Sequence, residues 1–266
     1  MLAKYMGLFG AYTKQYLNGL ILEEHRPMAV LKVVHTQKVR AEMKRLGAAI
    51  GLDARALFLA ELSGLFHDIG RFEQLRRFGT FVDRKSVDHA RLSAEIVVEQ
   101  GFLSDLQKVD RESVVSAIRR HNMRTVPPAS MWLESVLTLL LRDADKLDIW
   151  RVFHEHYSVD RPGTREEDST LELGMPDTPG ISPQVYEDIM AGRIVDISCV
   201  KNRNDFAMAR LAWIFDINFV PTLMEIHRRG YIPAMEEYLP DFEGKKALFQ
   251  RVTGYVSDMI ARPSSL

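Results

Sequence analysis

The chain has 266 residues, of which 46% are hydrophobic and 27% charged, enough to bury one sizeable globular core. Its 35 basic and 36 acidic side chains leave a formal net charge of -1, which argues against a nucleic-acid-coating protein and a polybasic membrane anchor, since both carry a basic excess. The single cysteine, Cys199, excludes an intramolecular disulfide and a Cys-rich zinc site.

The first twenty residues are moderately apolar but are interrupted by Lys4, Lys14 and Gln15. They lack the continuous apolar stretch and the small-residue cleavage site of a signal peptide. No segment approaches the ~20 apolar residues that a membrane-spanning helix needs. We therefore expect a soluble cytoplasmic protein.

Helical periodicity dominates the residues up to Trp150. Apolar residues recur at three- and four-residue spacing from Met28 to Ile50, and Gly51 then favours a helix end. Asp53 suits the N-cap of a helix over 54–66. No stretch alternates between apolar and polar residues with hairpin turns, so the pattern predicts an all-α fold. The other helices expected here run over 89–100, from Asp110 as N-cap to near His121, and from Ser130 as N-cap to Trp150.

A break in the helical pattern follows. Pro, Gly and charged residues dominate 160–183, which we interpret as a long loop or lid. We expect a single domain over 1–266, with its core at about 28–150 and a helical C-terminal extension over 184–266 packed on that core. Helices in the extension are expected to start at Ser182-Pro183 and to run over Phe206–Asn218, Pro221–Arg229 and Phe242–Ala261.

Five histidine and aspartate features lie in or at the ends of the predicted helices. In chain order they are His35 in LKVVHTQKV, the pair His67-Asp68 in LFHDIGR, His89 in SVDHARLSAEI, His121 in AIRRHNMR and Asp145 in RDADKLD. Neutral imidazoles and carboxylates are good ligands for Mn, Fe, Zn, Ni or Co, and helical bundles build such sites from facing helices. The set therefore indicates a metal site inside the bundle.

Adjacent His67 and Asp68 cannot share one narrow helical stripe, but at a helix end they can reach two sides of one site. A carboxylate there can bridge two metal ions with its two oxygens. Two ions ~3.5–4 Å apart can activate a water molecule and clamp a phosphoryl group, so no Ser or Cys nucleophile is required.

The order His, His-Asp, Asp resembles the HD superfamily of metal-dependent phosphohydrolases, whose fold is an all-α helical bundle. The HDIG form followed by interposed histidines resembles the two-metal members, which include HD-GYP phosphodiesterases and bacterial hydrolases of dinucleoside tetraphosphates. The resemblance implies two divalent ions (Mn, Fe, Ni, Zn or Mg) and Asp68 as the bridging ligand. The terminal ligands that the resemblance implies are His35, His67, His89, His121 and Asp145.

A narrower resemblance reaches further along the chain. The strings HDIGRFEQLRRFGTFVDRKSVDHA, AIRRHN, RDADKLDIW and LAWIFDINF look like a group of bacterial HD-domain proteins, with the core likeness over about 28–150. HD-GYP proteins carry a second His where this chain has Asn122, and no GYP-type string follows, which counts against cyclic dinucleotide cleavage. The dinucleoside-tetraphosphate enzymes are shorter and lack such a tail.

Several residues keep a second interpretation. His89 can simply occupy a first helical turn, and His121 can be a C-terminal helix His favoured by the dipole, which would leave one metal. Periodicity does not separate Asp145 from its neighbours Asp143 and Asp148, and only the family pattern selects it. Arg71 and Lys146 either hold phosphate oxygens or form ordinary surface salt bridges. Gln74, Asp83 and Ser86 can accept or supply hydrogen bonds that orient the ligating imidazoles from behind.

The resulting hypothesis is hydrolysis of a phosphate ester or anhydride in a nucleotide or other small phosphorylated metabolite, through metal-activated water. Asp68 positions the metals, and Arg71 or Lys146 steadies the developing charge. One alternative is a di-iron oxygenase, because some HD-fold oxygenases use a nearly identical ligand set. The other is a regulatory module that binds a nucleotide without turning it over.

Overall fold

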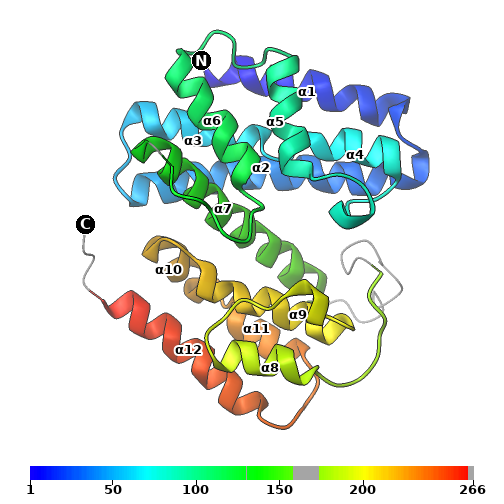
Figure 1. Ribbon diagram of the computed structural model, residues 1–266, viewed down its shortest axis with the longest axis vertical. Coiled ribbons are helices and arrows are strands. Elements are labelled where there is room, and N and C mark those ends of the chain that lie inside the picture. The colour runs from blue at the N-terminus through cyan, green and yellow to red at the C-terminus, as the bar shows by residue number, and fades with distance from the viewer. Residues whose placement is uncertain (130, 158–173, 263–266) are drawn as a thin grey trace. The chain divides into compact units, whose positions relative to one another are not determined.

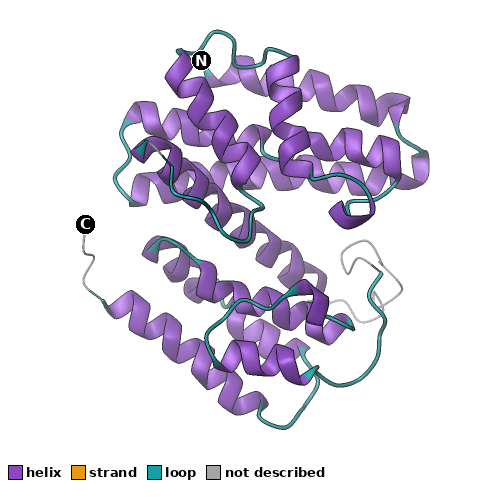
Figure 2. Ribbon diagram, viewed as in Figure 1, coloured by secondary structure: helices purple, strands orange, loops and turns teal. Residues whose placement is uncertain are grey.

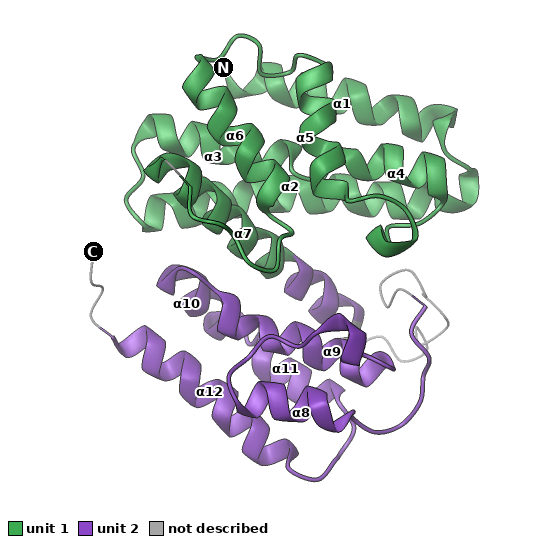
Figure 3. Ribbon diagram, in the orientation of Figure 1, with its two compact units in different colours: residues 1–148 green, residues 149–266 purple. Residues whose placement is uncertain are grey.

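The structure is a computed structural model that describes residues 1–129, 131–157 and 174–262. Within these ranges the regular structure is helical and contains no strand, which confirms the predicted all-α fold (Figures 1 and 2). None of the helices in these ranges combines the length and the apolar character needed to cross a bilayer. The chain divides into two compact units, Met1–Asp148 and Ile149–Leu266 (Figure 3). The single-domain boundaries drawn from the sequence stay a prediction.

Unit 1 is a bundle in which α2 and α3 follow the prediction closely. Two helices were not foreseen, α1 with Tyr5 and Phe9 buried, and α4 with Phe72 and Leu75 buried. The helices of unit 1 are α1 (Leu2–Gln15), α2 (Arg26–Ala49), α3 (Ala54–Phe66), α4 (Gly70–Phe78), α5 (His89–Glu99), α6 (Lys108–Arg120) and most of α7 (Trp132–Tyr157).

The helix starts agree with the sequence in part. The Asp53 carboxylate accepts the amide of Ala56 at 2.8 Å and caps α3 as predicted. The prediction of Asp110 as an N-cap was wrong: the N-cap of α6 is Gln107, three residues earlier, and the Asp110 carboxylate pairs with Arg55 instead. Ser130, the expected cap of the next helix, lies outside the described residues.

The central element of unit 1 is α3, which is buried on nearly all sides from Leu59 to Phe66. Gly64 lets this helix approach α2 closely, since a Cβ there would lie 2.9 Å from the Cα of Arg40. The close approach brings the end of α3, where His67 and Asp68 follow, beside the part of α2 that carries His35.

Gly70 sets a second close contact, between the start of α4 and α5. A Cβ at this position would lie 2.6 Å from the amide nitrogen of Ser93 and 2.9 Å from the carbonyl oxygen of His89. The amide of Gly70 also donates to Ser93 Oγ at 2.9 Å. The glycine of the HDIG string therefore holds the turn after Asp68 against the helix that begins at His89.

Unit 2 is also helical. Its α12 packs against α8, α10 and α11, and its core includes Ile189, Met208 and Leu248. Besides the end of α7, its helices are α8 (Pro183–Met190), α9 (Arg203–Leu211), α10 (Val220–Arg228), α11 (Tyr231–Tyr238) and α12 (Lys245–Ala261).

Three expectations for unit 2 need correction. The helix predicted over Phe206–Asn218 is α9 followed by a 3-10 helix over Ala212–Asp216. Helix α11 was not foreseen, and α12 begins at Lys245 rather than Phe242. Pro183 opens α8 as predicted, but the Ser182 side chain donates to Asp205 instead of capping the helix. Most of the predicted lid at 160–183 lies outside the described residues, which resume at 174.

Candidate metal centre

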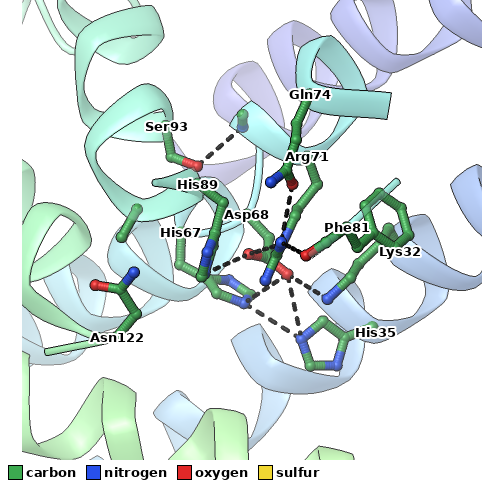
Figure 4. A network of polar contacts seen from close by, with 12 residues as sticks. Lys32, His35, His67, Asp68, Arg71, Gln74, Phe81, His89, Ser93 and Asn122 are labelled. Atoms are coloured by element: carbon green, nitrogen blue, oxygen red, sulfur yellow. Dashed lines mark hydrogen bonds and ion pairs between the residues drawn. The ribbon is translucent and has the colours of Figure 1, made fainter. Parts of the chain in front are cut away.

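The six predicted metal ligands all belong to unit 1, and their side chains meet at one place, part of which Figure 4 shows. Their side chains are buried, except that of Asp145, which is 21% exposed. They come from α2 (His35), the turn after α3 (His67, Asp68), the first residue of α5 (His89), the residue after α6 (His121) and α7 (Asp145).

The first group of ligand atoms contains His35, His67 and Asp145. His35 Nε2 lies 3.0 Å from Asp145 Oδ1 and 3.3 Å from His67 Nε2. Asp68 Oδ2 lies 3.6 Å from His35 Nε2 and 3.5 Å from His67 Nε2. His35 Nε2, His67 Nε2 and Asp145 Oδ1 thus lie close together, and Asp68 Oδ2 lies beside them.

The second group contains His89 and His121, whose Nε2 atoms lie 3.2 Å apart. The other oxygen of Asp68, Oδ1, lies 3.6 Å from His89 Nε2. Asp68 therefore turns one oxygen toward each group, which is the orientation that a bridging carboxylate requires.

Two of the imidazoles are fixed by backbone carbonyls. Nδ1 of His67 lies 2.8 Å from the carbonyl oxygen of Gly64, and Nδ1 of His121 lies 2.7 Å from that of Ile118. A carbonyl only accepts hydrogen bonds, so the Nδ1 atoms carry the protons. In the neutral rings each Nε2 then presents a lone pair to the cluster.

The other two imidazoles are held by carboxylates. Nδ1 of His35 lies 2.7 Å from Asp148 Oδ2, and Nδ1 of His89 lies 2.6 Å from Asp83 Oδ2. Such partners orient a ligating imidazole and increase the basicity of its free nitrogen. Asp83 thus accepts the hydrogen bond from a predicted ligand imidazole, as the sequence analysis expected.

Burial controls the charge of the histidines. It lowers the pKa of His67, and it lowers the pKa of His89 and of His121 to about 4, so these rings are neutral near pH 7. For His35, burial and the charge of Lys32 act in the same direction, but hydrogen bonds to Asp145 and Asp148 outweigh them and raise its pKa.

The two carboxylates of the cluster are ionised. Burial alone would raise the pKa of Asp68, but the positive charges of Lys32 and Arg71 hold it well below its usual range. Burial opposes ionisation of Asp145 in the same way, and the hydrogen bond from His35 lowers its pKa. Ionised carboxylates and neutral imidazoles are the forms that bind metal ions.

These donors fit divalent metal ions. Asp68 Oδ1 is buried and accepts no hydrogen bond from the residues that the structure describes, with Arg71 Nε 3.5 Å away. The Nε2 lone pairs of neutral His89 and His121 face each other at 3.2 Å, which is unfavourable unless a cation lies between acceptors. A donor set of a carboxylate and two imidazoles suits Mn, Fe, Ni or Zn. It is less suited to Mg or Ca, which prefer sites made only of oxygen ligands.

Arg71 is engaged by neighbouring groups. Its Nη1 donates to Gln74 Oε1 at 2.8 Å and to the carbonyl oxygen of Phe81 at 2.7 Å (Figure 4). The same nitrogen donates to Asp83 Oδ1 at 2.9 Å. The Gln74 amide donates to the same Asp83 oxygen and to Ser86 Oγ. Arg71 therefore connects Asp68 to the carboxylate that orients His89. The phosphate role of Lys146, which is buried in α7, stays a prediction.

One cation beside the cluster was missed by the sequence analysis. Lys32 Nζ donates to Asp68 Oδ2 at 2.7 Å. Lys32 precedes His35 by three residues in α2, and residues at that spacing share one face of a helix. Its position relative to His35 was therefore the available signal.

Comparison with known families matches residues 33–150 to the family described as the HD domain. The matched range contains all six predicted ligands and their partners Asp83 and Asp148, and it begins one residue after Lys32. Neither the curated proteins nor the solved structures include a match to the chain.

Proposed function

Residues 33–150 of the chain belong to the HD domain family, and from this premise we propose that the protein is a metal-dependent phosphohydrolase. HD domains are in general metal-dependent hydrolases, and the His and Asp groups of this chain are suited to hold metal ions. We propose as substrate a phosphate ester or anhydride, in a nucleotide or another small phosphorylated metabolite. The observation that carries the proposal is that Asp68 turns one oxygen toward each of two groups of imidazoles.

In this proposal His35, His67 and Asp145 would hold one ion, His89 and His121 would hold the other, and Asp68 would contribute to both. When bound, a pair of divalent ions supplies Lewis acidity toward phosphoryl oxygens and lowers the pKa of water, so that a nucleophile is available near neutral pH.

The contribution of the chain is to hold the ligands in one geometry. Asp148 and Asp83 orient His35 and His89 through their Nδ1 atoms at 2.7 and 2.6 Å. Burial of the imidazoles keeps water from the sides of the cluster and strengthens its electrostatic interactions. The packing of α2, α3, α5 and α6 fixes the backbone from which these side chains extend.

The experiment compares the wild type with Asp68→Ala and, as a control, with Asp105→Ala, a surface aspartate of unit 1 that pairs with Lys4. Metal content is measured by mass spectrometry, and phosphate release is screened over nucleotides and sugar phosphates with added Mn²⁺. We expect about two ions per chain and phosphate release in the wild type and the control. Both are lost in Asp68→Ala.

Other outcomes separate the alternatives. One ion per chain with retained hydrolysis would give His89 and His121 roles other than metal binding. Product formation that depends on iron and on molecular oxygen would replace the phosphohydrolase with the di-iron oxygenase. Tight nucleotide binding with no product over hours, under any metal loading, would replace it with the regulatory module.

A further inference from the structure

The two cations beside Asp68, Lys32 and Arg71, differ in how firmly hydrogen bonds to neighbouring groups hold them in place. The two hydrogens of Arg71 Nη1 are shared among Gln74, Phe81 and Asp83, which fixes the guanidinium plane. Its Nε is buried and lies 3.5 Å from Asp68 Oδ1, so the guanidinium is held against the carboxylate and cannot turn toward a ligand. The Lys32 ammonium has three N–H groups, and among the residues that the structure describes its hydrogen-bond partner is Asp68. Lys32 therefore has donors left for a ligand.

The position of Lys32 also differs from that of the carboxylate it contacts. Its side chain is 17% exposed, whereas that of Asp68 is 2% exposed. Its Nζ lies 5.6 Å from the centre of the Phe81 ring, which stands beside the cluster in Figure 4. The Lys32 side chain is thus more accessible to solvent than the carboxylate it contacts, so an anion can approach it from outside.

Lys32 extends from a helix that the core holds in place. Val39 and Met43, further along α2, are fully buried, so the backbone of the helix is anchored while the four-carbon stem of Lys32 can still rotate. Divalent ions on Asp68 would compensate the charge of this carboxylate. The ammonium is then available to another anion within the reach of its stem.

We propose that Lys32 is the phosphate-binding cation of this site, and that Arg71 is a positioning residue acting through Asp83 and His89. The inference rests on the proposed phosphohydrolase function and deepens it. Lys32 donates hydrogen bonds to a phosphate oxygen of the substrate, and Arg71 keeps the orientation of the second group of ligands.

The test measures binding of inorganic phosphate and of Mn²⁺ by calorimetry, on full-length protein. Lys32→Met is compared with Lys38→Met, which removes the same charge from an exposed position on the same helix. We expect Lys32→Met to weaken phosphate binding to the Mn²⁺-loaded protein by about 10- to 100-fold, the worth of a hydrogen bond to a charged group. Its Mn²⁺ stoichiometry is unchanged, and Lys32→Arg restores part of the phosphate affinity.

Arg71→Met should show the opposite pattern, with weaker Mn²⁺ binding and a smaller effect on phosphate at saturating metal. The proposal is overturned if Lys32→Met binds phosphate as tightly as Lys38→Met, or if it loses Mn²⁺ and phosphate together. Hydrolysis and phosphate binding that both survive in Lys32→Met would leave the phosphohydrolase intact and reject only the role of Lys32. A wild type that binds Mn²⁺ but neither binds nor releases phosphate would reject both.

Discussion

Asp148 Oδ2 lies 2.7 Å from Nδ1 of His35, although 113 positions separate the two residues in the sequence. The contact joins α7 to α2 at the cluster. It also directs Nε2 of His35 toward Asp145, 3.0 Å away. Asp83 makes the equivalent contact with His89 in the second group of ligands. Each half of the cluster thus has its own orienting carboxylate.

This arrangement predicts that Asp148→Asn and Asp83→Asn weaken different metal sites. Each substitution keeps the shape of the side chain but removes the charge that orients one imidazole, and such changes typically cost about 10- to 100-fold in metal affinity. Titration with Mn²⁺ should show one weakened and one retained site in each variant. A double variant should weaken both sites. Identical titration curves for wild type and Asp148→Asn would contradict the role given to this carboxylate.

Gly70→Ala tests the contact between α4 and α5. The new Cβ would lie 2.6 Å from the backbone nitrogen of Ser93, which cannot move as a flexible side chain can. We expect a loss of about 1–3 kcal/mol in the free energy of unfolding, measured by denaturation followed by circular dichroism. The matched control is Gly7→Ala in α1, where the added Cβ would have no heavy atom within 4 Å apart from the adjoining backbone of its own helix. That variant should gain about 0.5–1 kcal/mol from helix propensity. Equal stability of the two variants would disprove the close contact.

Glu73, which lies outside the proposed metal cluster, should make the stability of the fold depend on pH. Hydrogen bonds from Arg76 lower the pKa of Glu73 to about 2, and those from Arg77 and Tyr16 act in the same direction. Because the folded-state pKa lies below the ordinary value of 4.5, the stabilisation is complete above pH 4.5 and is lost as the pH falls toward 2.

Glu73→Gln should therefore be less stable than the wild type at pH 6, by on the order of 1 kcal/mol after solvent screening. The difference should shrink between pH 4.5 and pH 2. Urea unfolding at pH 6 and pH 3 measures it, with Glu112→Gln at an exposed position of α6 as the control. A Glu73→Gln difference that is the same at both pH values would exclude this carboxylate as its source.

The sequence located most of the cluster because His35, His67, Asp68 and His89 each stand at a helix face or end that periodicity and capping reveal. The first-turn position considered for His89 is confirmed, since it is the first residue of α5, after the N-cap Asp88, and its Nε2 also faces the cluster. Its role as a metal ligand stays a prediction. A position in the first turn does not prevent a side chain from pointing inward.

The aspartates of α7 show why the remaining residues of the cluster could not be identified from the sequence pattern. This helix is apolar on most faces, so periodicity could not separate Asp145 from Asp148, and only the family resemblance chose between them. The structure places both at His35, one on each ring nitrogen. Lys32 was missed for a related reason, because a lysine near the start of a helix usually faces solvent. Its contact with Asp68 depends on the packing of α2 against α3.

Metal removal should affect the two units differently, because the six predicted ligands lie in unit 1. An ion that binds only the folded state stabilises it by about 2.7 kcal/mol at a concentration of 100 times Kd. Hydrogen exchange with and without EDTA should therefore show Mn²⁺-dependent protection in α2, α3 and α5, and little change in α12 of unit 2. Asp68→Ala should abolish this protection. Equal protection of α12 and α3 would mean that the ions stabilise the chain as one cooperative unit. No protection in either would show that the cluster does not bind Mn²⁺ in solution.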